Sequence, residues 1–418
     1  MSLYAPARSP EGRWSWRPPA RGTSGDPRSS PGGEPTSPDL ATYLSTRFGD
    51  RTALIEPRLG RRWTYRSLAE EAESWAALLE GRGVGSGDRV ALLGPNRGCA
   101  VPLLMGCWKV GAALAPVNHR LAAEELQVEM ARLQLRGAVV EESPEWTGRM
   151  QRWVPGATIP LRSPDPSPAT RARGVPTSGE SIGLILSTGG STGPPKSAML
   201  SVRAILSNAL NTASSWDLRP DDVGLPLFPF FHTGGWNVLL LPLLAVGATS
   251  VVLERAEPGA VLAEILRTKA TILSAVPTTL SDLVRLPGFE ETDLGSLRFA
   301  KSGGGLTPEP VVRQFRQRGI AFYQGYGLTE AGPNLFYSAP EDLDRPGSVG
   351  RPTPLAELVL RNERGDTDTE GELWVRGPLT FSGYLGDSAA TEAAMVDGWV
   401  ATGDLLRRDV DGFHYFVG

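Results

Sequence analysis

Residues 187–196 read Ser187-Thr188-Gly189-Gly190-Ser191-Thr192-Gly193-Pro194-Pro195-Lys196, directly after an apolar segment at 182–186 that we predict to be a buried β-strand. Successive glycine and hydroxyl residues allow backbone N–H groups to converge on an anion, and the final lysine adds a positive charge. The pattern therefore predicts a phosphate-binding loop. An exposed flexible loop is disfavoured, because such loops seldom end in Pro-Pro-Lys behind a strand.

Two other motifs have a similar spacing. A Walker A loop has glycine directly before its lysine, where this sequence has Pro195. The spacing Gly189-x-Ser191-x-Gly193 fits the nucleophile elbow of α/β hydrolases, which would make Ser191 a covalent nucleophile. An elbow continues into a helix, however, and Pro195 disfavours the helical conformation at Pro194. A serine hydrolase is therefore a disfavoured alternative.

The segments on both sides of the loop alternate helices with apolar strands. We predict helices over 65–79, 101–110, 122–133, 202–213 and 259–268, and strands over 89–93, 137–140, 182–186, 250–253 and 272–276. This alternation predicts parallel sheets covered on both faces. After about residue 347, short strands with tight turns predict a small β-rich lobe, with strands over 355–360, 371–376 and 413–417. The predicted fold class is α/β, with two α/β lobes of parallel-rich sheets covered by helices, plus this β-rich lobe.

These patterns also predict domain boundaries. We expect a disordered leader over 1–37, a first α/β lobe over 38–180, a second α/β lobe with the phosphate loop over 181–346, and the β-rich lobe over 347–418. The leader is rich in proline, glycine, serine and arginine, so it cannot form a core, and it lacks the apolar stretch of a secretory signal. No charged residue lies between Asp222 and Glu254, but prolines and polar residues interrupt this stretch. We therefore predict loop, helix and buried strand there, and no membrane span.

Composition limits the class of protein. The chain has 418 residues, of which 40% are hydrophobic and 21% charged, which excludes disorder of the whole chain. A net charge of −4 gives no basic field, so nucleic acid is not an expected partner. Cys99 and Cys107 are too sparse for a disulfide framework, and the three histidines are too far apart for a zinc site. We expect a cytoplasmic protein.

The loop resembles the phosphate loop of the adenylate-forming superfamily, which comprises acyl-CoA synthetases, adenylation domains of peptide synthetases, and luciferases. The matching positions are Thr188, Gly189, Gly190, Ser191, Thr192, Gly193, Pro195 and Lys196. Ser197 replaces the family's final glycine. The resemblance implies that the loop wraps the β- and γ-phosphates of ATP.

Further motifs follow in the order of this family, and the resemblance covers about residues 39–418. The stretch 324–330, Gln-Gly-Tyr-Gly-Leu-Thr-Glu, resembles a signature that implies three roles. Tyr326 lies against adenine, Thr329 meets the α-phosphate, and Glu330 helps to hold Mg²⁺. In Thr402-Gly403-Asp404, the aspartate is implied to accept hydrogen bonds from both ribose hydroxyls.

A glycine-rich segment, Ser302-Gly303-Gly304-Gly305, resembles the one that approaches adenine and the bound acid. The expected nucleotide-binding residues outside the loop are Ser302, Gly303, Gly304, Gly325, Tyr326, Gly327, Thr329 and Asp404. The stretches 371–377 and Gly383-Tyr384 match a further family motif, for which we expect a structural role. The expected catalytic residues are Thr329, Glu330, Lys196 and His232.

Residues 228–237 resemble the family's aromatic-histidine segment beside the acid cavity. Relatives that activate amino acids carry aspartate where this chain has His232, so we expect an acid without an α-amine. Phe230, Phe231 and Trp236 are expected as aromatic walls, and the glycines at 303–305 as a flat slot. The expected substrate-binding residues are Phe231, His232, Trp236, Gly304, Gly327 and Leu328. A planar aryl acid such as a benzoate or aminobenzoate is favoured, with a medium-chain fatty acid as the alternative.

The resemblance implies an AMP-forming acid–CoA ligase with ATP, Mg²⁺ and coenzyme A, which makes an acyl-adenylate and transfers the acyl group to the thiol. In the family, a mobile C-terminal domain with a bridging lysine follows the position of Gly418; we expect it to be absent and the chemistry impaired in this form. The alternatives are an acyl-AMP ligase and a non-catalytic adenylate-binding module. A carrier-protein partner and a homodimer are both left open.

Overall fold

The computed structural model describes residues 39–142, 158–164, 178–189, 195–342 and 345–418, together with the backbone of two short strands, β1 (Ala7–Arg8) and β2 (Trp14–Ser15). β1 pairs antiparallel with β2. The predicted disorder of the leader otherwise concerns residues outside those described. Residues 38–418 form a compact unit separate from 1–37.

The first sheet has six strands in the order β10-β9-β6-β5-β7-β8. All neighbours are parallel except β10, which runs antiparallel to β9. The strands are β5 (Arg89–Leu93), β6 (Ala113–Val117), β7 (Gly137–Val140), β8 (Thr158–Pro160), β9 (Ile182–Thr188) and β10 (Lys196–Ser201).

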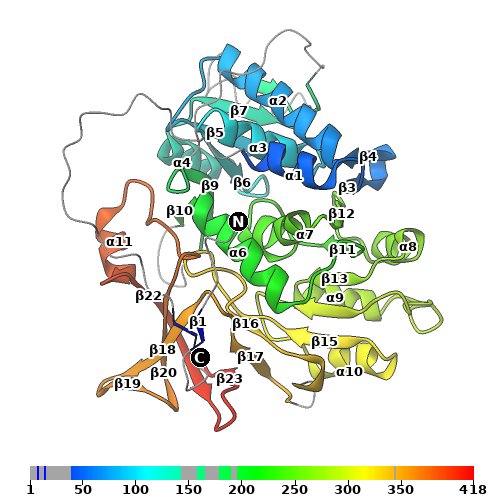
Figure 1. Ribbon diagram of the computed structural model, residues 1–418, viewed down its shortest axis with the longest axis vertical. Helices are drawn as coiled ribbons and strands as arrows, with labels where there is room; N and C mark the ends of the chain where they lie inside the picture. The colour runs from blue at the N-terminus through cyan, green and yellow to red at the C-terminus, as the bar shows by residue number, and fades with distance from the viewer. Residues whose placement is uncertain are drawn as a thin grey trace. The chain divides into compact units, whose positions relative to one another are not determined.

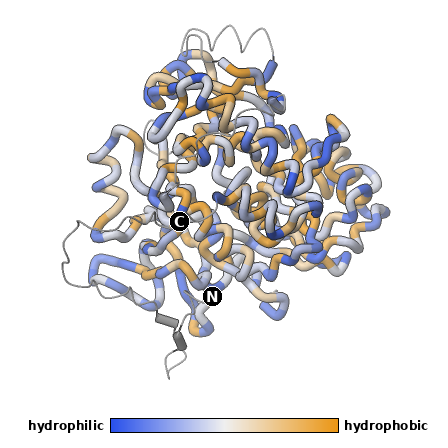
Figure 2. Tube along the Cα trace, turned by 45° about the horizontal axis from the view of Figure 1, so that its top comes forward, coloured by the Kyte–Doolittle hydropathy of each residue, from blue (hydrophilic) through white to orange (hydrophobic). Residues whose placement is uncertain are grey.

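Helices cover both faces of this sheet. Alternate residues of β5 point to opposite faces, so Val90 and Leu92 pack with α2 (Tyr65–Gly81) and α3 (Ala100–Lys109), whereas Ala91 and Leu93 pack with α4 (Ala123–Leu133). α1 (Leu40–Phe48) packs on α2 and is capped by Asp39. Figure 2 shows apolar segments concentrated inside the packed layers and hydrophilic ones on the outer loops.

The second sheet has seven strands in the order β15-β14-β13-β11-β12-β3-β4, parallel except for the antiparallel pair β3 and β4. One face is covered by α6 (Val202–Ser215) and α7 (Leu240–Val246), and the other by α8 (Pro258–Thr268), α9 (Pro277–Val284) and α10 (Glu309–Gln317). In Figure 1, α10 lies alongside β15. The strands are β3 (Thr52–Glu56), β4 (Arg61–Thr64), β11 (Val223–Pro226), β12 (Thr249–Val251), β13 (Ile272–Ala275), β14 (Phe299–Ser302) and β15 (Ala321–Gln324).

The long uncharged stretch after Asp222 folds into β11, a π-helical turn (Gly234–Val238), α7 and β12. The prediction of loop, helix and buried strand is confirmed. Within the described ranges, no helix is long and apolar enough to cross a membrane.

The third sheet is antiparallel, in the order β16-β17-β23-β22-β20-β18-β19, with β21 paired to β22 and the short helix α11 (Ser388–Ala394) beside it. Its strands are β16 (Phe336–Tyr337), β17 (Ser348–Pro352), β18 (Glu357–Asn362), β19 (Gly365–Thr367), β20 (Glu370–Arg376), β21 (Met395–Val396), β22 (Trp399–Arg408) and β23 (His414–Phe416). The predicted fold class is confirmed: two α/β layers with parallel-rich sheets, and a β-rich lobe.

The sheets cross the predicted lobe boundary in both directions. β9 and β10, which flank the predicted phosphate loop, belong to the first sheet, because β9 pairs with β6 at Leu184 and Leu114. β3 and β4 belong to the second sheet, because β3 pairs with β12 at Leu54 and Ser250. The predicted phosphate loop therefore joins two strands of the first sheet, not of the second.

Candidate active site

Lys196 and Glu330 lie on either side of one tyrosine. The segment 382–385 runs beside β10, where the Met199 amide donates to the Gly383 carbonyl at 2.9 Å and the Leu385 amide to the Ser197 carbonyl at 2.8 Å. This register places the Tyr384 ring 5.0 Å from the Lys196 Nζ, while the Tyr384 hydroxyl donates to Glu330 Oε1 at 2.8 Å. Burial, and then the Glu330 carboxylate, raise the pKa of Tyr384, so the phenol stays a donor.

Tyr326 and Asp404 are joined directly. The Tyr326 hydroxyl donates to Asp404 Oδ2 at 2.6 Å. Burial, reinforced by the Asp404 hydrogen bond, raises the pKa of Tyr326 above its ordinary value. The ring centroid lies 5.7 Å from that of Phe336 and 6.3 Å from that of Phe416. Tyr326 and Glu330 share the loop after β15, so this loop connects the Asp404 contact to the Lys196 contact.

A bulge in β22 orients Asp404. Along β20, Trp374 pairs with Ala401 and Glu372 with Leu405, so three residues of β22 lie opposite the single residue Leu373. The Thr402 hydroxyl donates to the Leu373 carbonyl at 2.8 Å and accepts the Asp404 amide at 3.2 Å. Gly403 has φ +75°, a conformation that glycine adopts without strain. The Thr402-Gly403-Asp404 motif is therefore a bulge within a strand.

The predicted glycines fall into two groups. A Cβ added at Gly303 would meet no atom within 4 Å, and one at Gly304 would meet only Val276 Cγ1 at 3.9 Å. The space beside these two glycines is open, as a binding slot requires. Gly304 also has φ +79°.

Gly325 and Gly327 are instead required by packing. A Cβ at Gly327 would lie 2.3 Å from the Pro333 carbonyl carbon, and one at Gly325 would lie 2.9 Å from the Ser302 carbonyl oxygen. The Gly325 amide donates to that same oxygen at 2.6 Å. Ser302 is buried, and its hydroxyl has no hydrogen-bond partner among the described residues. Gly325 therefore lets the loop after β15 pack closely on the end of β14, and Gly327 lets this loop fold back on its own residues Gly332 and Pro333.

Of the predicted phosphate loop, the structure describes Ser187, Thr188, Gly189, Pro195 and Lys196; the predicted positions Gly190, Ser191, Thr192 and Gly193 lie outside the described residues. Thr188 pairs with Lys196 across β9 and β10, so the two ends of the loop meet. Thr329 and Leu328 lie in the loop after β15, where the Leu328 amide donates to the Gly332 carbonyl at 3.2 Å.

The aromatic residues predicted to bind the acid also fall into two groups, with Phe231 and His232 in one and Trp236 in the other. The Phe231 ring lies 4.7 Å from the His232 ring and 5.5 Å from the His119 ring, and the Arg120 guanidinium is 5.5 Å from its centroid. Partial burial, with a contribution from Arg120, lowers the pKa of His232 and favours the neutral ring. Trp236 does not form a wall.

Trp236 is a core residue. Its side chain is fully buried, its indole N–H donates to the Phe230 carbonyl at 2.6 Å, and its ring lies 4.4 Å from the Phe230 ring. The π-helical turn directs this side chain into the hydrophobic core below α6 and α7. The expectation that Trp236 and Phe230 line the acid pocket is therefore wrong.

Sequence reasoning missed two residues. The motif around Tyr384 predicts only a structural role, because its contacts with Lys196 and Glu330 arise from tertiary pairing. Lys301, on β14 next to Ser302, is 4% exposed, and its Nζ lies 4.1 Å from the centre of the Trp216 ring. Burial lowers the pKa of Lys301 to about 7. The scarcity of lysine in the sequence was a usable signal for this residue.

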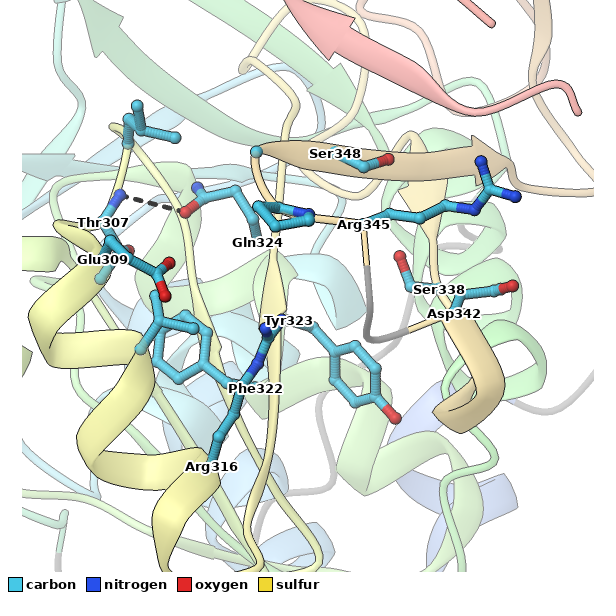
Figure 3. Close-up of a pocket in the computed structure, with 14 residues that line it drawn as sticks. Thr307, Glu309, Arg316, Phe322, Tyr323, Gln324, Ser338, Asp342, Arg345 and Ser348 are labelled. Carbon is cyan, nitrogen blue, oxygen red and sulfur yellow. Dashed lines mark hydrogen bonds between the residues drawn. The ribbon is translucent and has the colours of Figure 1, made fainter. Parts of the chain in front are cut away.

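A separate cavity of about 50 Å³ is lined by Gln324, Thr307 and neighbouring side chains (Figure 3). The Gln324 side chain accepts the Thr307 amide at 3.1 Å and donates to the Gly305 carbonyl at 2.8 Å, which ties the glycine-rich turn to β15. Arg316, Arg345 and other residues line this cavity, but none of the predicted site residues does. It is too small for a nucleotide.

Comparisons with known proteins show the family of this chain. Residues 43–385 match the AMP-binding enzyme family. The chain belongs to that family. Over 370 residues, it is 32% identical to a feruloyl-CoA synthase from an Amycolatopsis species, and the match covers 86% of this chain and 74% of that protein. Over 406 residues, it is 32% identical to an indoleacetate–CoA ligase from Aromatoleum aromaticum, covering 91% and 78% of the two chains.

Solved structures of this AMP-binding family share the fold. The N-terminal domain of FACL13 from Mycobacterium tuberculosis, with an inhibitor bound, superposes with a TM-score of 0.84 at 27% identity, covering 90% of this chain and 98% of that one. The O-succinylbenzoate coenzyme A synthetase from Bacillus subtilis, in complex with AMP, superposes with a TM-score of 0.82 at 26% identity, covering 91% and 78%.

Proposed function

We propose that this AMP-binding enzyme is an ATP-dependent acid–CoA ligase that activates a carboxylic acid as its acyl-adenylate before transfer to coenzyme A. The observation that carries the proposal is the pair of contacts Lys196–Tyr384–Glu330 and Tyr326–Asp404, which are linked because Tyr326 and Glu330 lie on the same loop after β15. The relatives named as feruloyl-CoA synthase and indoleacetate–CoA ligase support the reaction class.

Each end of this arrangement suits one part of ATP. Lys196 provides a positive charge for the β- and γ-phosphates, and the Thr329 hydroxyl a donor for the α-phosphate, where charge grows as the acid attacks. Asp404 has a second carboxylate oxygen for the ribose hydroxyls, since Tyr326 occupies Oδ2. The Tyr326 ring gives the adenine a flat apolar face. The protein thus contributes by holding the α-phosphate and the carboxylate in line.

The residues present also fit Mg²⁺. Glu330 offers one carboxylate, with Oε1 oriented by the Tyr384 hydroxyl. No group of three or more His, Cys, Asp or Glu side chains forms a metal cage in the described part of the chain. A magnesium ion at Glu330 would therefore take its other ligands from phosphate oxygens and water, as it usually does at nucleotide sites. When bound, it neutralises phosphate charge.

For the acid, we propose an aryl carboxylic acid without an α-amine. The neutral His232 ring is accessible to solvent and lies 4.7 Å from the buried Phe231 ring, and the open backbone at Gly303 and Gly304 leaves room for a flat ring. No carboxylate stands at position 232 to pair with an ammonium group. The alternative acid is a medium-chain fatty acid.

The test is calorimetric binding of ATP with Mg²⁺, AMP and a non-hydrolysable aryl-adenylate mimic to the native chain. Asp404→Asn is expected to weaken all three by about tenfold or more, because the ribose loses a charged acceptor. Asp366→Asn is the matched control, since the exposed Asp366 side chain forms an ion pair with Arg361 in the same lobe. Equal affinities of the Asp404→Asn variant and the native protein would contradict the ribose role.

Lys196→Met separates the phosphate contact from the others. It is expected to weaken ATP by about tenfold and to leave the aryl-adenylate mimic within about twofold, since the mimic has no β- or γ-phosphate. Equal losses for both ligands would contradict the assignment. A thermal-shift comparison of aryl and alkyl acids, each with ATP and Mg²⁺, then tests the acid class. Larger shifts with the alkyl series would exclude the aryl proposal.

A further inference from the structure

Helix α4 contacts both ends of the predicted phosphate loop. Glu129, which is 6% exposed, lies beside the hydroxyl of Ser187, the penultimate residue of β9, and this neighbour acts to lower the pKa of its carboxyl. One turn further along the helix, the Arg132 guanidinium donates to the carbonyl of Pro195, directly before Lys196. Residues three apart share a helix face, so one face of α4 faces the point where the loop leaves β9 and the point where it enters β10.

The helix itself is fixed to the sheet. Leu126, Met130 and Leu133 are buried against β5, β6 and β7. At its N-terminus, the Glu125 side chain accepts the Ala122 amide at 3.1 Å. A helix held in this way can act as a rigid support for the backbone that it contacts.

The buried carboxyl of Glu129 is unfavourable for stability by itself. Burial raises the pKa of Glu129 to about 7, while Arg132 and the Ser187 hydroxyl act in the opposite direction. The charged group that acts on it is Arg132 on its own helix, and the Ser187 hydroxyl on β9 acts in the same direction. An apolar residue would fill this position at lower cost, so the carboxyl calls for a role other than stability.

We propose that Glu129 and Arg132 are positioning residues for the phosphate loop, which hold its two ends on the first sheet so that Lys196 is directed toward Tyr384 and Glu330. Thr188 pairs with Lys196, so the two ends of the loop meet there. Holding Ser187 and Pro195 in place therefore holds both ends of the loop. This inference rests on the proposed role of residues 187–196 in binding the phosphates of ATP.

The test compares two nucleotides on the same protein. Arg132→Met keeps the aliphatic stem but removes the donor to Pro195. We expect ATP with Mg²⁺ to bind about tenfold more weakly and AMP to bind within about twofold of the native protein, because AMP has no β- or γ-phosphate. Arg132→Lys restores a donor and is expected to recover most of the ATP affinity. Glu129→Met is expected to reproduce the selective loss of ATP.

Glu124→Gln is the control, because Glu124 lies exposed in the first turn of the same helix. It should leave both affinities unchanged. If Arg132→Met weakens ATP and AMP equally, or neither, the positioning role is overturned. If Glu129→Met does not fold, Arg132→Met and Arg132→Lys decide the question, because Arg132 is only partly buried. If the native protein binds neither nucleotide, the proposed function fails, and the inference fails with it.

Discussion

At the scale of single residues, Tyr384 shows that tertiary contacts can indicate a role that the sequence motif does not. Its hydroxyl bonds to Glu330 while its ring supports Lys196, so it joins the proposed metal ligand to the proposed phosphate ligand. Tyr384→Phe removes only the hydroxyl. We expect Mg²⁺-dependent ATP binding to weaken by about fivefold, because Glu330 loses the donor that orients it. Calorimetry of ATP binding with and without Mg²⁺ measures this loss. Tyr43→Phe is the control, because Tyr43 is half-exposed. An unchanged Mg²⁺ dependence would remove Tyr384 from the site.

Lys301 gives a prediction about stability and pH. Its folded pKa of about 7 lies below its ordinary value of 10.5, so between these values the unfolded chain binds more protons than the folded one. The destabilisation is complete below about pH 7, shrinks as the pH rises toward 10.5, and is absent above it. Lys301→Met should therefore raise the melting temperature by several degrees at pH 6.5 and hardly at all near pH 10.5. Denaturation curves at both pH values check this. An equal gain at both would mean that packing, and not charge, is responsible.

Single residues also show how much of the site the sequence alone could predict. Asp404, Tyr326, Glu330 and Lys196 lie in recognisable motifs, and the structure brings them together. Trp236 lies in a motif too, but its indole is turned into the core by a π-helical turn that no local pattern announces. Lys301 and Tyr384 matter because of what the fold places around them, which single-sequence patterns do not encode.

Among elements, the bulge in β22 is the feature that turns a strand into a binding element. Gly403 has φ +75°, and a Cβ there would meet no atom within 4 Å. A side chain at this position is therefore disfavoured by the backbone conformation and not by a steric clash. Gly403→Ala should lower the free energy of unfolding by about 1 kcal/mol and weaken AMP binding, because relieving the strain shifts Asp404. Gly81→Ala in α2 serves as control, because a Cβ at Gly81 would also meet no atom within 4 Å but the residue does not have a positive φ. Urea denaturation and AMP calorimetry measure the two effects. Unchanged AMP affinity would mean that the bulge does not orient Asp404.

Helices and strands with strong apolar periodicity were predictable nearly to the residue, as β5 (Arg89–Leu93) and α4 (Ala123–Leu133) show. Among the elements missed, β10, β14, β15 and the π-helical turn are short or mix polar residues into the strand. For such segments, tertiary contacts decide the conformation more than local propensity does.

At the scale of the whole molecule, strand order was beyond prediction, because β9 and β3 are paired by partners distant in the sequence. With this strand order, each sheet contributes one part of the proposed ligand site. The first contributes Lys196, the second the loop after β15, and the third Asp404. AMP should therefore slow amide exchange in 320–336 and 399–408, and ATP with Mg²⁺ should add protection in 182–201, because only ATP reaches the phosphate loop. Hydrogen–deuterium exchange with mass spectrometry distinguishes these patterns, and Lys196→Met should lose only the added protection. Equal protection of 182–201 by AMP and ATP would mean that this segment responds to closure of the whole unit and does not contact the β- and γ-phosphates.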